Sequence, residues 1–249
     1  MDVLPPPDYP PLQPSDYPQM PTRTPPATLE VLRASCVSGG IQKFQLLDRG
    51  LHMDTLYTLE AVNAQAKDIL EVFLKNGWNI NQPISELKPP FYAIQDKEMV
   101  AWLLDHGADP NRQCVIDLTP LSLAIESAPV SVIQLMLNRG GDIRKGQLLH
   151  HAIERHSDNI TVLSLLRGKG ADINSTMYKD HYPSRALFSF MGLGTPLHKA
   201  AELGKADVAR YLVSKGANLH NKDGKGRTAL DYAHMLNQRV VIHALEEGK

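Results

Sequence analysis

Residues 195–218 read TPLHKAAELGKADVARYLVSKGAN, and their order predicts two short helices in succession. Thr195 can cap a first helix through its hydroxyl oxygen. Pro196 suits the first helical position, because the amide hydrogen that proline lacks has no partner there. Gly204 can adopt the left-handed conformation that ends a helix. The first helix is therefore expected between Thr195 and Gly204.

The two helices are expected to pack against each other as a helix-turn-helix hairpin. The first helix has a stripe of small apolar residues that lets a second helix approach closely: Leu197, Ala200 and Ala201. The second helix has one apolar face, formed by Val208, Tyr211 and Leu212. Gly216 is expected to end this helix in the left-handed conformation.

The same unit recurs along the chain. Helix-ending glycines are separated by 27, 30, 33, 30, 46 and 32 residues, and they are Gly50, Gly77, Gly107, Gly140, Gly170, Gly216 and Gly248. Weaker copies of the unit begin near Leu29, Thr55, Pro89, Thr119, Gln147 and Thr228. A single unit cannot bury its apolar face, so neighbouring units must stack into one continuous core. We therefore predict about seven repeats in residues 28–249.

The unit resembles the ankyrin repeat. The resemblance is carried by the Thr-Pro-Leu-His start at 195–198, the paired alanines, and the Gly-Ala-Asp or Gly-Ala-Asn endings at 107–109, 170–172 and 216–218. It extends over about nine-tenths of the chain. It implies an all-α solenoid of stacked helix-turn-helix units with finger loops, and a function as a protein-protein interaction scaffold.

Residues 1–27 are expected to form a disordered, proline-rich tail, because clustered proline favours extended polyproline II structure. Within this tail Pro6, Pro7, Asp8 and Tyr9 resemble the Pro-Pro-x-Tyr ligand of WW domains. A WW-domain protein is thus one candidate partner, with Pro6, Pro7 and Tyr9 as the contacting residues. The alternative is a leader that only adds solubility.

Composition and charge exclude several other partners. The net charge is −1, with 26 basic and 27 acidic residues, so no electrostatic attraction to nucleic acid or anionic lipid is predicted. The sequence has no basic segment followed by an apolar run at its start and no long apolar stretch elsewhere. We expect a monomer in the cytoplasm or nucleus, with Cys36 and Cys114 reduced.

Clustered histidines and one glycine-rich segment are the features of the sequence that could indicate metal or phosphate binding. His150 and His198 occupy the histidine position of the repeat start, where the ring is expected to pack and to form local hydrogen bonds. We identify no carboxylate or thiol that completes a ligand set with His150, His151 and His156 at helical spacing, so no metal is predicted. The Gly224–Thr228 segment lacks the Ser or Thr that follows lysine in a phosphate loop, and is predicted to be a turn before a helix capped by Thr228.

The two cysteines add no catalytic chemistry, because neither has a base beside it in the sequence. The sequence therefore predicts neither an enzyme nor a cofactor.

The connections between repeats are unequal in length. Gly140 to Gln147 spans 7 residues, whereas Gly170 to Thr195 spans 25, which is 13 more than the regular neighbours. The long connection, residues 175–193, is rich in aromatic side chains, namely Tyr178, Tyr182, Phe188 and Phe190. It is predicted either to fold back, with Phe188 and Phe190 buried against the repeat at Thr195, or to project and bind a partner.

The resemblance implies that the partner contacts variable positions of the first helices and the fingers. In the first helices these positions are Glu126, Glu154, Arg155, Glu202, Leu203 and Met235. In the fingers they are Gln82, Arg112, Val115, Lys225 and Arg227. Two alternatives to a simple scaffold stay open. One is a regulatory adaptor whose tail recruits a WW-domain ubiquitin ligase, and the other is a fragment of a larger ankyrin-containing enzyme.

Overall fold

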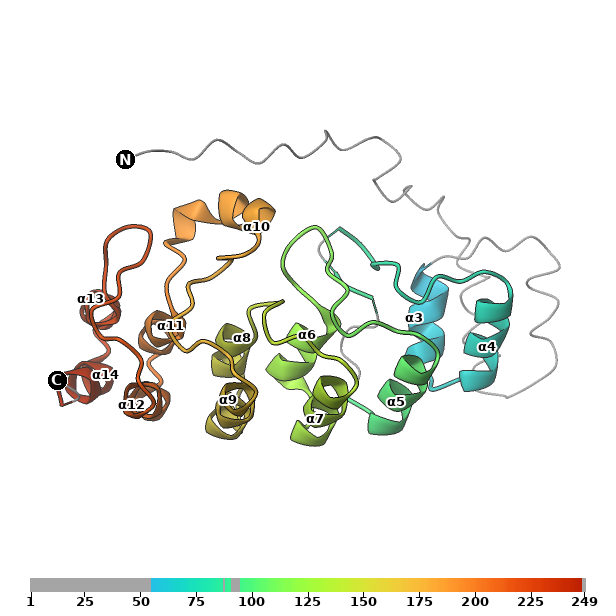
Figure 1. The fold of residues 1–249 in the computed structure, drawn as a ribbon, viewed down its shortest axis with the longest axis horizontal. Coiled ribbons are helices and arrows are strands. Elements are labelled where there is room, and N and C mark those ends of the chain that lie inside the picture. Colours follow the sequence, from blue (N-terminus) through green and yellow to red (C-terminus); the bar gives the residue numbers. More distant parts are fainter. Residues whose placement is uncertain (1–54, 87, 91–94, 248–249) are drawn as a thin grey trace.

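Helical hairpins stack side by side in the computed structural model, which describes residues 55–86, 88–90 and 95–247 (Figure 1). Four pairs are consecutive in space: α6 (Pro120–Ser127) with α7 (Val130–Asn138), α8 (Leu148–Glu154) with α9 (Asn159–Gly168), α11 (Pro196–Glu202) with α12 (Ala206–Ser214), and α13 (Ala229–Met235) with α14 (Arg239–Glu246). A further pair, α3 (Thr55–Asn63) with α4 (Lys67–Lys75), precedes them, and α5 (Lys97–Asp105) packs on α7. The predicted all-α repeat array is confirmed.

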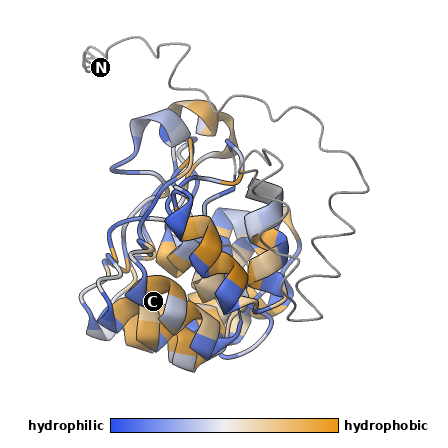
Figure 2. Ribbon diagram, turned by 90° about the vertical axis from the view of Figure 1, so that its right-hand side faces the viewer, coloured by the Kyte–Doolittle hydropathy of each residue, from blue (hydrophilic) through white to orange (hydrophobic). Residues whose placement is uncertain are grey.

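First helices pack on first helices, and second helices pack on second helices. Thus α6, α8, α11 and α13 form one row, while α12 and α14 pack together in the other. Their buried side chains join into one hydrophobic core that runs from Tyr57 to Leu245. Apolar residues gather in the helices, and hydrophilic residues dominate the connecting loops (Figure 2). In the described part of the chain the only strand-like pairing is an isolated bridge between Ser85 and Lys88.

The predicted helix ends are confirmed at the described positions. Each of the described helix-ending glycines has a positive φ, between +89° and +99°: Gly77, Gly107, Gly140, Gly170 and Gly216. Gly204 also lies in the left-handed region, with a φ of +69°. At the helix starts, Thr119 and Thr228 accept the amide hydrogens of Ser122 and Asp231. The repeat predicted near Leu29, with Gly50 and Gly248, lies outside the described residues.

Asparagines join successive fingers through a repeated pair of hydrogen bonds. Asn81 donates to the carbonyl of Gly107 and accepts from the amide of Asp109, at 2.9 and 2.7 Å. Asn111 and Asn174 form the same pair with the next fingers. The matching position in the clipped finger is Arg144, whose guanidinium instead pairs with Asp142. This link is therefore interrupted where the short finger precedes the long one.

The long connection folds into its own small element. It contains α10 (Tyr182–Leu187) and the 3₁₀ helix η3 (Ser189–Met191), and it lies on the finger side of the array (Figure 1). We call residues 175–193 the insert.

Candidate protein-binding surface

The exposed side chains of α6, α8, α11 and α13 make up what we call the inner-helix face. The predicted partner-binding residues on it include Glu126 and Glu202, both exposed, and Glu154, half-buried. Leu203 and Met235 are apolar and exposed, Met235 to 62%. These five side chains are thus available for contact with another molecule.

Arg155 is the exception, because the structure buries a side chain that was expected to contact a partner. Only 4% of the Arg155 surface is exposed. The guanidinium donates to the carbonyls of Ile125 and Ala128 at the end of α6 and to that of Ser157. Burial lowers the pKa of Arg155. Because helix ends leave carbonyls without partners, this arginine is committed to capping the neighbouring repeat.

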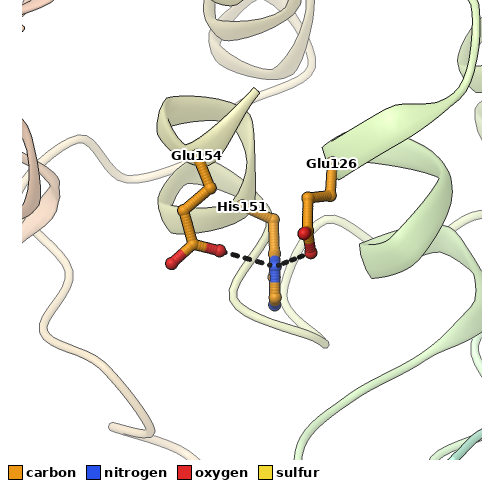
Figure 3. A group of neighbouring side chains, drawn as sticks. All are labelled: Glu126, His151 and Glu154. Carbon is orange, nitrogen blue, oxygen red and sulfur yellow. Dashed lines mark hydrogen bonds and ion pairs between the residues drawn. The ribbon is translucent and has the colours of Figure 1, made fainter. Parts of the chain in front are cut away.

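A chain of charged groups crosses the inner-helix face from α6 to α11, and Figure 3 shows the part of it that joins α6 to α8. His151 Nδ1 lies 3.2 Å from Glu126 Oε2 and 3.3 Å from Glu154 Oε2. Lys199 continues the chain, with its ammonium 2.9 Å from the other oxygen of Glu154 and 3.4 Å from Glu202. Three of the predicted surface residues are therefore joined by two basic residues that sequence reasoning did not select.

These contacts change the pKa values of the groups involved. Burial disfavours the charged form of His151, but hydrogen bonds to Glu126 and Glu154 outweigh burial and raise its pKa. The hydrogen bond from His151, with a second from Lys199, holds the pKa of Glu154 at about 2 despite its partial burial. Burial similarly opposes the charge of Lys199, while Glu154 and Glu202 raise its pKa. The cluster is thus a set of mutually stabilised charges.

The two repeat-start histidines are buried, as predicted, and hydrogen-bonded to the next repeat or finger. His150 Nε2 lies 3.1 Å from the carbonyl of Gly194, and burial lowers its pKa to about 4. His198 Nε2 lies 2.9 Å from the carbonyl of Arg227, while its Nδ1 receives the amide of Thr195 at 3.0 Å. An acceptor role for Nδ1 requires the neutral ring, with the proton on Nε2.

The structure places carboxylates beside one of the histidines, contrary to the expectation from the sequence. Glu154 lies three residues after His151 on α8, and Glu126 faces the same ring from α6. Carboxylates therefore do stand beside one of these histidines. The spacing of Glu154 was readable from the sequence, whereas the approach of Glu126 depends on the stacking of two repeats.

Among the finger residues, Gln82, Arg112, Val115 and Lys225 are exposed. The backbone amide of Val115 donates to the carbonyl of Glu86, so two neighbouring fingers are tied while the Val115 side chain stays outside. The Gly224–Thr228 segment forms the predicted turn, with Thr228 capping α13.

Arg227 is half-buried because it holds the last finger in shape. Its guanidinium forms two hydrogen bonds to the buried carboxylate of Asp223, at 3.0 and 2.7 Å, and lies over the ring of Tyr232. Burial raises the pKa of Asp223, but the hydrogen bonds from Arg227 outweigh it and hold that pKa at about 2. The Arg227 guanidinium therefore interacts mainly with residues of its own repeat, Asp223 and Tyr232.

Polar contacts anchor the insert at both of its ends. Buried Ser184 of α10 accepts the amide of Asp117 through its hydroxyl, at 2.8 Å, and Gln147 accepts the amide of Tyr178 at 2.9 Å. At the other end the carbonyl of Gly192 accepts the amide of Gly224 at 2.5 Å. The insert thus spans from the finger before α6 to the finger before α13.

Asp117 is central to the first anchor and was missed by sequence reasoning. Its buried carboxylate accepts from the amide of Gly146 at 2.8 Å and from the side chains of Gln113 and Gln147 at 2.6 and 2.5 Å. It therefore ties its own finger, the clipped finger and the insert together. Its position two residues before the Thr119 cap was the only sequence signal.

The aromatic residues of the insert divide into two pairs. Tyr178 and Phe188 are half-buried and stack on each other, with ring centroids 5.3 Å apart. Tyr182 and Phe190 are exposed, Phe190 to 68%, and Leu187 and Met191 are exposed beside them. Phe190 is not buried against the repeat at Thr195, so the predicted fold-back applies to only part of the insert. We call Tyr182, Leu187, Phe190 and Met191 the apolar patch.

A pocket of about 160 Å³ lies between the clipped finger and the base of the insert. Its lining includes Arg144, Gln147, His150, Asp172 and Lys179. Arg144, where the asparagine link is interrupted, is part of this lining. The candidate WW ligand of Pro6, Pro7 and Tyr9 lies outside the described residues.

Comparison with known families agrees with this architecture. The family model for ankyrin repeats (3 copies) matches residues 58–147 and 149–248. The chain belongs to the ankyrin-repeat family. None of the helices in the described ranges is long and apolar enough to cross a membrane.

Several curated proteins are similar to parts of the chain. The putative palmitoyltransferase ZDHHC13 of Danio rerio is 24% identical over 199 residues, which cover 78% of this chain and 30% of that protein. The putative ankyrin repeat protein FPV244 of Fowlpox virus is 29% identical over 180 residues, 71% of this chain and 24% of the viral protein. Alpha-latrocrustotoxin-Lt1a of Latrodectus tredecimguttatus is 29% identical over 141 residues, 55% of this chain and 9% of the toxin. The chain thus spans less than a third of each.

Proposed function

We propose that this chain is a non-catalytic scaffold that binds a partner protein through its inner-helix face, its fingers and the apolar patch of the insert. Ankyrin repeats are in general protein-protein interaction modules, which supports the class of function. We further propose that it acts as a monomer in the cytoplasm or nucleus, in keeping with the free thiol of Cys114.

The observation that carries the proposal is the exposure of the apolar patch on an anchored element. An exposed loop needs no large apolar side chains, yet Tyr182, Leu187, Phe190 and Met191 all face solvent. The hydrogen bonds of Ser184 and Gly192 hold this element in place before any partner binds. Aromatic and methionine side chains on a preorganised support are typical of binding hot spots, since little ordering entropy is lost on association.

The test separates the exposed pair of aromatic residues from the stacked pair. Tyr182→Ser with Phe190→Ser removes exposed rings, so the melting temperature should stay unchanged while proteins captured from a cell extract are lost. Phe188→Ser is the matched control, because it breaks the stack with Tyr178 and should lower the melting temperature. Capture of the same proteins by wild type and the exposed double variant would refute a role for the patch.

The regulatory adaptor is the second candidate, and it rests on the motif Pro6-Pro7-Asp8-Tyr9. A WW domain binds such a segment as a polyproline II turn. Titration of the full chain with an isolated WW domain tests the idea, with Tyr9→Ala as the variant that should abolish binding and Tyr17→Ala as the control. Equal binding by both variants would contradict it.

A further inference from the structure

Three potential metal-binding atoms converge on the inner-helix face. They are Oε2 of Glu126, Nδ1 of His151 and Oε2 of Glu154, and all lie within 4.8 Å of one another. Figure 3 shows the two carboxylates on opposite sides of the imidazole ring, with both dashed lines ending on the same ring nitrogen. One imidazole nitrogen with two carboxylate oxygens is a donor set that zinc accepts in proteins.

The two distances from His151 Nδ1 fit a metal ion as well as a shared proton. Zinc bonds to nitrogen and oxygen of about 2.0–2.2 Å in a tetrahedral site put neighbouring donors roughly 3.3–3.5 Å apart. The Nδ1 atom of His151 is 3.2 Å from one oxygen and 3.3 Å from the other. We propose that Glu126, His151 and Glu154 bind a divalent transition-metal ion such as Zn²⁺, with a fourth position open to water or to a group from a bound protein.

The fold holds the ligands in this arrangement without help from the ion. His151 and Glu154 are three residues apart on α8, so they share one face of that helix. Glu126 comes from α6, which packs directly against α8. The His151 side chain is only 18% exposed, so its ring has few other orientations. The ion would therefore cross-link two adjacent repeats.

The positive charge of Lys199 should affect the affinity of the site for Zn²⁺. Its ammonium contacts Oε1 of Glu154, at 2.9 Å, and not the proposed donor atom Oε2. The positive charge nevertheless repels a cation bound nearby, so affinity should be below that of four-ligand structural zinc sites. Lys199→Gln should therefore tighten metal binding. A metal site far from Lys199 would not respond in this way.

The experiment is calorimetric titration of the full, untagged chain with Zn²⁺, followed by Co²⁺ as a spectroscopic probe. We expect Glu126→Gln to weaken Zn²⁺ binding by more than about tenfold, because even loss of a residue behind a ligand commonly costs that much. Co²⁺ should give the strong visible bands of a tetrahedral site in wild type and lose them in this variant. Glu126 is exposed, so its contact with His151 contributes little to stability and the melting temperature without metal should change only slightly.

Glu202→Gln is the matched control, since it removes the same charge from the same face without removing a ligand. The control should bind Zn²⁺ within about twofold of wild type, because exposed charges interact weakly through water. The proposal is overturned if wild type shows no saturable Zn²⁺ binding, if Glu126→Gln binds as wild type does, or if Glu202→Gln loses as much affinity as Glu126→Gln. Weaker binding by Lys199→Gln would also overturn it.

Discussion

Replacing Asp117 by alanine tests whether one buried carboxylate organises the fingers and the insert. The carboxylate accepts three hydrogen bonds, from the amide of Gly146 and from the side chains of Gln113 and Gln147. Each hydrogen bond to a charged group contributes about 1.5–3 kcal/mol, but the contributions do not add when the donors can find water. Both glutamines are half-buried and can be rehydrated, whereas Gly146 is buried.

The free-energy loss should therefore be dominated by one buried amide without an acceptor. We expect Asp117→Ala to lower the free energy of unfolding by about 2–4 kcal/mol. Urea unfolding followed by circular dichroism measures the loss, and limited proteolysis should show faster cleavage within residues 175–193. The faster cleavage is expected because Gln147, which also holds Tyr178, loses its partner.

Asp172→Asn is the control for this experiment. Asp172 is exposed, and its carboxylate accepts from the amide of Asn174 two residues later. Its loss should cost less than about 0.5 kcal/mol, as for most surface substitutions. The reasoning is refuted if Asp117→Ala costs no more than Asp172→Asn, or if the insert is cleaved at the wild-type rate.

Three further predictions follow from the helix ends, the buried histidine and the stacking order. Gly216→Val should lower stability by more than about 1 kcal/mol in thermal unfolding. Nothing lies within 4 Å of the added Cβ, so the whole cost comes from the φ of +95°, and an unchanged melting curve would contradict it. Burial lowers the pKa of His198, so the stability it contributes is present above the unfolded pKa of about 6.5 and is lost as the pH falls below that value. The melting temperature of wild type should decline between pH 7 and 5 more steeply than that of His198→Gln, and equal slopes would exclude this histidine. Amide exchange should be faster in α14 than in α7 and α9, because among the described repeats the pair α13 and α14 packs on only one other pair, and slower exchange in α14 would be inconsistent with that order.

Much of the fold could be predicted because its signals are local. The left-handed glycines, the threonine caps and the proline at the first helical position act within a few residues, so they can be read from one stretch of sequence. Gly216, Thr228 and Pro196 all occupy the predicted conformations. The unequal fingers were likewise visible as a difference in spacing.

The candidate surface was harder to predict because it depends on contacts between repeats. Arg155 was expected on the partner-binding surface, yet it is buried, because the carbonyls at the end of α6 come within its reach only after stacking. The same holds for the contact between Glu126 and His151, which are 25 residues apart. Ser184 and Asp117 are 67 residues apart, and neither forms part of a repeated motif.

The two anchors of the insert also change the mechanics of the array. In an ordinary solenoid each repeat contacts only its neighbours, so the array can bend or unfold at one interface between repeats at a time. Here the insert is hydrogen-bonded to Asp117 and to Gly224, and it runs past the intervening repeats on the finger side of the array. Bending that moves the fingers apart must stretch the insert or break its hydrogen bonds, whereas bending in the opposite direction does not strain it. The rod should therefore flex in a preferred direction and resist opening from its C-terminal end.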